Sequence, residues 1–391
     1  MSQQSPQPRM RRDASTGPVP ELRFTAHHFP VSSAFVNFLD EVTGQMRIVR
    51  EEQDWGDQIT ERMGKGLRNI PEIRKVVQSA SDAAFKTELG RDLTLRAYNL
   101  FGHLLTGNKD FYGQMHSANR FILVVSAPRH GGSYLTKELY RAVGRDHRAL
   151  PNYFAHDGFP EANNAWIGND GMETMPMTRR TLQQTAEWIT MADWFFRDSR
   201  PLAGMRTIPK KGTKMVYEGR FFRDLFGPLA EWVIAVRHPA AACLSLVEKA
   251  GGMTPDGRFP IQPRSVIERW VVESWETDGV TRQEVGRMPY FEAYLHYWLR
   301  YHQIMAVNGL LQGNRRLTVL PYQRSTFESY VSAQHARFAS GRPTETFFVH
   351  GTVREEYPEW IIQSAKTIED VAHLWGSFGV DFPVAEISAA Y

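Results

Sequence analysis

The stretch that most constrains this chain runs from residue 121 to residue 144 and reads FILVVSAPRHGGSYLTKELYRAVG. Five apolar residues open it, and such a short, β-branched run before Ser-Ala-Pro is typical of a buried parallel strand. A turn of small residues follows, and apolar residues then recur at helical spacing up to Gly144. A strand, a glycine-containing loop and a helix in this order can bind a phosphate, because backbone N–H groups and the positive helix N-terminus face the loop.

The loop contains the residue types that an anion site needs. Arg129 supplies a charge, and Ser133 places a hydroxyl in the first helical turn. Gly131 and Gly132 allow an anion to approach the backbone closely. The loop is not a nucleoside-triphosphate P-loop, because no Gly-Lys pair precedes Ser133.

A second strand candidate, WVIAV at 232–236, ends in Arg237-His238-Pro239. Ser245 follows eight residues after Arg237, within a helical run at 240–250. An arginine at a strand end offers a bidentate fork to a phosphate. Magnesium-dependent NTPases tend to end this strand in Asp, so the arginine favours an anion site over a metal site.

The two segments together resemble the two cofactor motifs of the sulfotransferase family. Residues 128–135 read PRHGGSYL, against the family pattern P-K/R-S-G-T-T/S-W-L. The second family motif is an apolar strand, Arg-[Asn/Asp/His]-Pro, and a Ser eight residues after the Arg. The resemblance implies an α/β fold with a parallel β-sheet flanked by helices, the P-loop-NTPase-like sulfotransferase fold. It also implies metal-independent, in-line transfer of a sulfuryl group from 3′-phosphoadenosine 5′-phosphosulfate (PAPS).

The resemblance also implies roles for individual residues. The 5′-phosphate of PAPS would be held by the first motif, at Arg129, His130, Gly131, Gly132, Ser133 and Tyr134. The 3′-phosphate would be held by Arg237 and Ser245. Lys214 lies near the position of a family lysine that steadies the leaving phosphate.

The general base is the least determined residue. Many family members have a catalytic His two residues after that lysine, but this chain has Val216 there. His156 and Asp157 follow the first helix and are candidates, because an imidazole or a carboxylate can accept the acceptor's proton. Glu138, one turn into that helix, is the third candidate.

Composition and length limit the function classes. The 391 residues carry a formal charge of only +3, which argues against nucleic acid as the main partner. One cysteine and no His/Cys ligand spacing predict no metal site. The absence of a transmembrane run or secretory signal predicts a cytoplasmic protein. The expected acceptor is a small molecule, sugar or lipid, of which the sequence does not identify one.

Three parts are expected along the chain: a disordered arm at 1–20, a helical N-terminal extension at 21–120 and an α/β domain at 121–391. The extension would pack on the core or mediate a homo-oligomer. Residues 148–212 show little periodicity and are expected to form an acceptor loop with a short helix at 188–197; further strands are expected at 215–217 and 317–320, and aromatic core helices at 264–312. Two other functions remain open: a P-loop-related kinase or phosphotransferase, and a non-catalytic nucleotide-binding protein.

Overall fold

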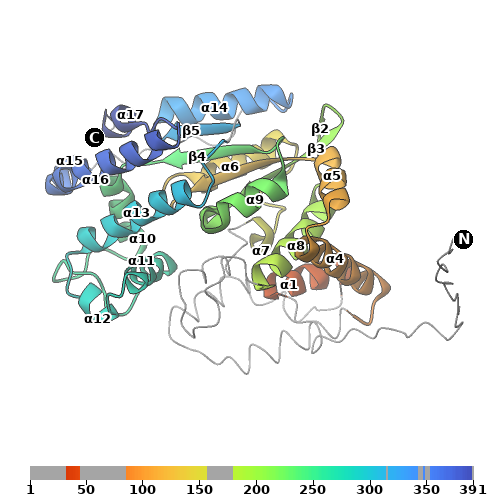
Figure 1. Ribbon diagram of the computed structural model, residues 1–391, viewed down its shortest axis with the longest axis horizontal. Coiled ribbons are helices and arrows are strands. Elements are labelled where there is room, and N and C mark those ends of the chain that lie inside the picture. The colour runs from red at the N-terminus through yellow and green to blue at the C-terminus, as the bar shows by residue number, and fades with distance from the viewer. Residues whose placement is uncertain are drawn as a thin grey trace, which may run out of the picture.

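The computed structural model describes residues 32–44, 85–155, 179–313, 316–341, 347 and 353–389. Within these residues five strands form one sheet in the order β2-β3-β1-β4-β5 (Figure 1). The strands are β1 (Asn119–Ser126), β2 (Pro201–Leu202), β3 (Met205–Lys211), β4 (Glu231–Val236) and β5 (Leu317–Pro321). All neighbours pair in parallel except β2 with β3. The predicted α/β class is confirmed, and the sheet, predicted to be parallel, is mostly parallel with one antiparallel pair.

The centre of the sheet is β1, and it is the apolar run on which the prediction depends. Phe121 to Val125 are all at most 1% exposed, as expected for a strand covered on both faces. On one side Leu123 pairs with Lys210, and on the other it pairs with Trp232. Because these strands are parallel, the loops that leave β1, β3 and β4 all emerge at the same edge of the sheet.

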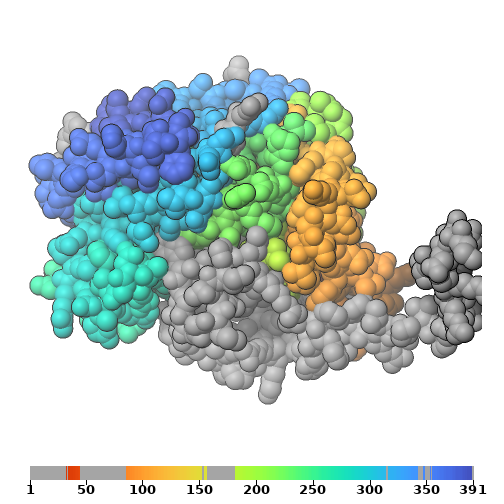
Figure 2. Space-filling model, in the orientation of Figure 1, coloured from red at the N-terminus to blue at the C-terminus, as the bar shows by residue number. Residues whose placement is uncertain are grey.

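Helices flank the sheet (Figure 1). They are α1 (Ser33–Thr43), α4 (Glu88–Thr106), α5 (Lys109–Ala118), α6 (Gly132–Ala142), α7 (Asn152–Ala155), α8 (Arg179–Phe195), the 3₁₀ helix η2 (Thr213–Glu218), α9 (Gly219–Phe226), α10 (Pro239–Lys249), α11 (Val266–Thr277), α12 (Arg282–Val285), α13 (Tyr290–Val307), α14 (Arg324–Arg337), α15 (Val353–Glu356), α16 (Pro358–Ser377) and α17 (Val384–Ala389). Figure 2 shows α5 (orange) and the C-terminal helices (dark blue) on opposite sides of the face in view.

In the N-terminal region, capping residues mark the start of α1 and the end of α4. The Ser32 hydroxyl accepts a hydrogen bond from the Phe35 N–H at 3.2 Å and starts α1. Gly107 adopts a left-handed conformation and ends α4. In space, α4 packs along α8, and α1 contacts both of them. The expected arm at 1–20 lies outside the described residues.

Two expectations for residues 148–212 and 215–217 are wrong. The described part of 148–212 is not aperiodic, because α8 runs over 17 residues and begins nine residues before the expected short helix. Residues 156–178, the middle of the expected acceptor loop, lie outside the described residues. Buried threonines hide the apolar period of α8, because Thr185 and Thr190 each bond the carbonyl four residues earlier. Residues 215–217 belong to η2 rather than to a strand.

The strand that the sequence analysis did not predict is β3, because its sequence MRTIPKK lacks an apolar run. Lys210 is fully buried in it, and its ammonium donates to the Phe154 carbonyl at 3.1 Å. Pro209 is tolerated because β2 pairs only with Met205 and Arg206, which leaves the other edge of β3 open at the proline. Paired polar groups therefore concealed a core strand.

The aromatic region at 264–312 forms helices, as predicted, and its aromatic side chains are core. Tyr290, Tyr294, Tyr297, Trp298 and Tyr301 of α13 are at most 1% exposed. The helix that carries them, α13, packs against α10, α11 and α16. This packing fixes α10, the helix that carries Ser245.

Candidate anion-binding active site

The loop after β1 has the backbone shape of an anion-binding turn. Arg129 has a φ of 69° and Gly131 a φ of 85°, both left-handed. A non-glycine residue held there costs on the order of 1 kcal/mol, and such strain concentrates at functional sites. α6 begins directly after Gly131 and no side chain caps it. The first N–H groups of α6 are therefore not satisfied by a capping side chain.

Neither glycine of this loop could be replaced without a collision. A Cβ atom on Gly131 would lie 2.6 Å from a ring carbon of Phe327 and 3.0 Å from one of Tyr322. A Cβ on Gly132 would lie 2.3 Å from the Ser126 hydroxyl oxygen. The glycines thus let the loop pass between the end of β1 and the aromatic side chains of the β5–α14 segment.

The second motif meets the first in space, across about 110 residues of sequence. The Arg237 guanidinium donates to the Arg129 carbonyl at 3.1 Å. The Arg129 guanidinium in turn donates to the Ser245 hydroxyl through Nε at 3.0 Å and Nη2 at 2.8 Å. The three residues that the motifs single out form one connected cluster, which we call the Arg129–Arg237–Ser245 cluster.

The position of Arg129 in this cluster differs from the sequence expectation. Its side chain, expected at the 5′-phosphate, lies against Ser245, the expected 3′-phosphate ligand. The backbone N–H groups of the loop remain as the donors of the first motif. A ligand with two phosphates would therefore meet both arginines at the second motif and the helix N-terminus at the first.

Electrostatics in the cluster favour an anion. Burial, followed by the nearby charge of Arg237, lowers the pKa of Arg129. Arg237 is 2% exposed, and its guanidinium also lies 4.3 Å from the ring centroid of Tyr322. Two like charges held this close repel each other, and a bound phosphate would relieve the repulsion.

His130, expected to contact the phosphate, instead points into the protein interior and links the loop to the second motif. Its ring is fully buried, and its Nδ1 accepts a hydrogen bond from the Arg237 backbone N–H at 3.2 Å. Burial, with a smaller contribution from the charge of Arg237, lowers the pKa of His130 to about 3. The imidazole is neutral at physiological pH and joins the two motifs through the protein interior.

Ser133 and Tyr134, the other loop residues in the prediction, occupy the first turn of α6. Ser133 is exposed, so its hydroxyl is accessible to a ligand. The Tyr134 ring packs against Phe347, with 5.0 Å between ring centroids. Phe347 also packs against Phe327 and Tyr322, so an aromatic cluster covers one side of the loop.

A lysine that the sequence reasoning missed lies beside the loop. The Lys211 side chain reaches the start of α6, where its Cε would be 3.6 Å from a Cβ on Gly132. Lys211 ends β3, which pairs in parallel with β1, so both strands deliver their last residues to the same edge. Lys214, the predicted lysine, is in η2, and its ammonium lies 4.7 Å from the ring centroid of Trp270. Recognising β3 as a strand would have identified Lys211.

The three candidates for the general base have different outcomes. Glu138 is fully buried, and its carboxylate pairs with Arg141 and, at 3.1 Å, with His335 of α14. These partners make it a link between α6 and α14, so its surroundings do not support a role as base. His156 and Asp157 lie outside the described residues.

One further carboxylate has an unusual environment. Burial raises the pKa of Glu218 to about 8, and its Oε1 has no hydrogen-bond partner among the described residues. Glu218 ends η2, one turn after Lys214. A carboxyl group that titrates near neutral pH is suited to proton transfer. No sequence pattern marks it.

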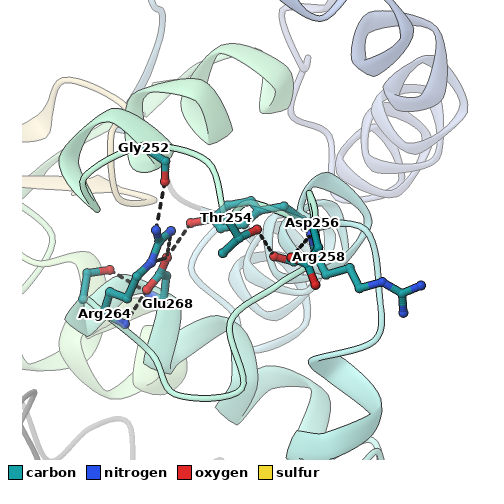
Figure 3. A network of polar contacts seen from close by, with 8 residues as sticks. Gly252, Thr254, Asp256, Arg258, Arg264 and Glu268 are labelled. Carbon is teal, nitrogen blue, oxygen red and sulfur yellow. Dashed lines mark hydrogen bonds and ion pairs between the residues drawn. The ribbon is translucent and has the colours of Figure 1, made fainter.

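The loop that follows α10 is held by a polar network (Figure 3). Glu268 is fully buried and accepts hydrogen bonds from the Arg264 guanidinium at 2.7 Å and from the Tyr290 hydroxyl at 2.8 Å. Arg264 also donates to the Gly252 carbonyl at 2.9 Å. The network anchors the chain just beyond α10 and so stabilises the helix that presents Ser245.

Comparisons with known proteins found no relative of this chain: neither the family models, nor the curated proteins, nor the solved structures contain a match to it. Across the described residues, no group of three or more His, Cys, Asp or Glu side chains could hold a metal ion. None of the helices described here combines the length and apolar character needed to cross a membrane.

Proposed function

We propose that this chain is a sulfotransferase that takes the sulfuryl group of PAPS and transfers it to a hydroxyl or amine. The observation that carries the proposal is the Arg129–Arg237–Ser245 cluster, which joins two motifs that resemble the family's phosphate-binding motifs. Had the two guanidiniums been on opposite sides of the molecule, one donor with two phosphates could not have reached both.

The residues around the cluster fit such a donor. The uncapped start of α6 and the exposed Ser133 would hold one phosphate. The two guanidiniums and Ser245 would hold the other. Lys211, beside the first turn of α6, would neutralise charge on the leaving phosphate.

The reaction itself needs little covalent chemistry from the protein. The bond between sulfur and the bridging phosphate oxygen breaks as a new bond forms from sulfur to the acceptor oxygen or nitrogen. The acceptor's proton passes to a base, for which His156 and Asp157 remain predictions and Glu218 is an additional candidate. The chain's contribution is to orient the donor and to stabilise the negative charge that develops.

Calorimetric titration tests the donor class. We expect adenosine 3′,5′-bisphosphate to bind and ATP to bind at least tenfold more weakly, because the clamp at Arg237 matches a 3′-phosphate. Arg237→Ala should weaken binding by about 100-fold, since a buried charged contact to a phosphate contributes about 2–4 kcal/mol. Arg237→Lys keeps the charge but loses the fork, and should lie between the two.

Arg337→Ala is the matched control. Arg337 forms a two-point contact to Glu231, at the opposite end of β4 from Arg237, through 2.7 Å bonds from Nη1 and Nη2. It should lower stability and leave nucleotide affinity unchanged. Preferential binding of ATP would favour the phosphotransferase alternative. If PAPS binds but its labelled sulfuryl group is not transferred to any member of a broad panel of hydroxyl and amine acceptors, a non-catalytic protein would be favoured.

A further inference from the structure

A second concentration of positive charge lies where α4, α8 and the start of β3 meet. It surrounds a pocket of about 320 Å³, at the small end of the roughly 300–1,000 Å³ typical of small-ligand sites. The lining combines three guanidiniums and one carboxylate with apolar side chains: Leu93, Arg96, Asp193, Trp194, Arg197 and Arg206. None of these residues belongs to the Arg129–Arg237–Ser245 cluster.

The charges in this lining are not balanced. Asp193 pairs with both Arg96 and Arg206, the latter at 2.7 Å, and is the one carboxylate among the described residues that line the pocket. Asp198 lies outside the lining but pairs with Arg197, so three positive charges against two negative charges leave a formal excess of +1. Arg206 is also held by Asn119, whose side-chain oxygen accepts from Nε at 3.0 Å. The pocket thus has a positioned guanidinium and a local field that favours an anion.

The third arginine, Arg197, packs over an aromatic ring. The Arg197 guanidinium lies 4.5 Å from the ring centroid of Trp194, a cation–π distance. Its side chain is 58% exposed and pairs with Asp198, its sequence neighbour, at 3.4 Å. Such a partly exposed guanidinium can turn toward a ligand at little cost, and the ring beneath it offers a flat apolar surface.

We propose that this pocket binds a small organic anion that carries one carboxylate or sulfate group on a flat apolar body. The anionic group meets Arg197 and Arg206, and the apolar body lies against Trp194 and Leu93. The site is separate from the proposed nucleotide site. Asn119 and Arg206 pair at the amino ends of β1 and β3, whereas the phosphate loop follows the carboxyl end of β1, about 23 Å away for the seven rises of about 3.3 Å that separate the first and last residues of this strand.

Calorimetric titration of the full chain with 2-naphthoate tests the proposal. We expect one site with a dissociation constant below about 1 mM, and at least tenfold weaker binding of 2-naphthalenemethanol, which has the same body without the charge. Arg197→Gln should weaken 2-naphthoate binding about five- to tenfold, as expected for loss of one charge-assisted contact. Because Arg197 is largely exposed, this variant should keep the wild-type melting temperature.

Arg282→Gln is the matched control, since Arg282 is also partly exposed and pairs with one carboxylate, that of Glu276. It should bind 2-naphthoate as the wild type does, and saturating adenosine 3′,5′-bisphosphate should not compete. The proposal is overturned if 2-naphthoate does not bind, if the alcohol binds equally well, if Arg197→Gln has no effect, or if the nucleotide displaces the probe. This outcome is independent of whether the nucleotide itself binds.

Discussion

The two strand–turn–helix units of the candidate site, β1 with α6 and β4 with α10, differ in how their helices begin and in which groups they present to an anion. In the first, a left-handed Gly131 starts a helix that no side chain caps. In the second, Pro239 occupies the first turn, and the His238 ring caps the helix by accepting from the Ala240 N–H at 3.3 Å. The first unit leaves backbone donors for a ligand. The second satisfies its own backbone and presents the side chains of Arg237 and Ser245 instead.

The largest difference in stability between the two units should come from substitutions that change the conformational freedom of the backbone. Gly131→Ala places a side chain at a φ of 85° and against Phe327, and we expect it to lower the free energy of unfolding by about 3 kcal/mol. Ala241→Gly, in the helix of the second unit, should cost about 1 kcal/mol through helix propensity. Urea denaturation followed by circular dichroism measures both. Equal losses in the free energy of unfolding would contradict the distinction between the two units.

The cap of the second unit makes a prediction about acid. Burial, and then the charge of Arg237, lower the pKa of His238 to about 4. The unfolded chain binds this proton near pH 6.5 and the folded chain near pH 4, so stability falls as the pH drops through that window. The loss from this residue should be about 2–3 kcal/mol at pH 4.

His238→Asn separates the cap from the titration. Asn retains a side-chain acceptor at the helix start but does not titrate, so stability at pH 7 should change by less than about 1 kcal/mol. Between pH 6.5 and 4 the variant should lose less stability than the wild type, while His130 continues to contribute in both proteins. An unchanged acid slope in urea titrations at several pH values would show that His238 is not the titrating group.

The serines of the two units differ in burial, and their removal should differ accordingly. Ser245 is 4% exposed and accepts two N–H groups of Arg129. Ser245→Ala should lower the free energy of unfolding by about 1–2 kcal/mol, because it leaves charged donors without their partner. Thermal unfolding of the protein without nucleotide measures this loss. A loss near zero would mean that Arg129 finds another acceptor.

The smallest effect is expected at Ser133, the exposed serine of the first unit. Ser133→Ala should change the free energy of unfolding by less than about 0.5 kcal/mol, as surface substitutions usually do. If its hydroxyl contacts a phosphate, the affinity for adenosine 3′,5′-bisphosphate should fall about fivefold. Calorimetry measures the affinity, and an unchanged value would remove Ser133 from the site.

The parts of the fold that follow from apolar pattern were predictable, and the parts built on paired polar groups were not. The runs at 121–125 and 232–236 identified two central strands because nothing polar interrupts them. β3 was missed because the cost of burying Lys210 is offset by its bond to the Phe154 carbonyl, which lies 56 residues earlier in sequence. Such a long-range partner cannot be inferred from local pattern.

The meeting of the two motifs could be predicted from the sequence, but the directions of individual side chains could not. The resemblance of the two motifs implied that Arg129, Arg237 and Ser245 contact the same donor, and the three residues meet in one cluster. Spacing could not show that His130 points into the interior or that Glu138 pairs with His335, because both depend on which neighbours pack against α6 and β4. Lys211 was missed for the same reason as its strand.

The short β2 has a consequence for how copies of this chain can meet. Sheet edges with exposed N–H and C=O groups invite pairing with another chain. Here a two-residue antiparallel strand that begins with Pro201 covers the start of one border, and Pro209 removes a donor further along it. The strand at the other border is five residues long and ends in Pro321. We therefore expect any self-association to use helical surfaces rather than a continuous intermolecular sheet.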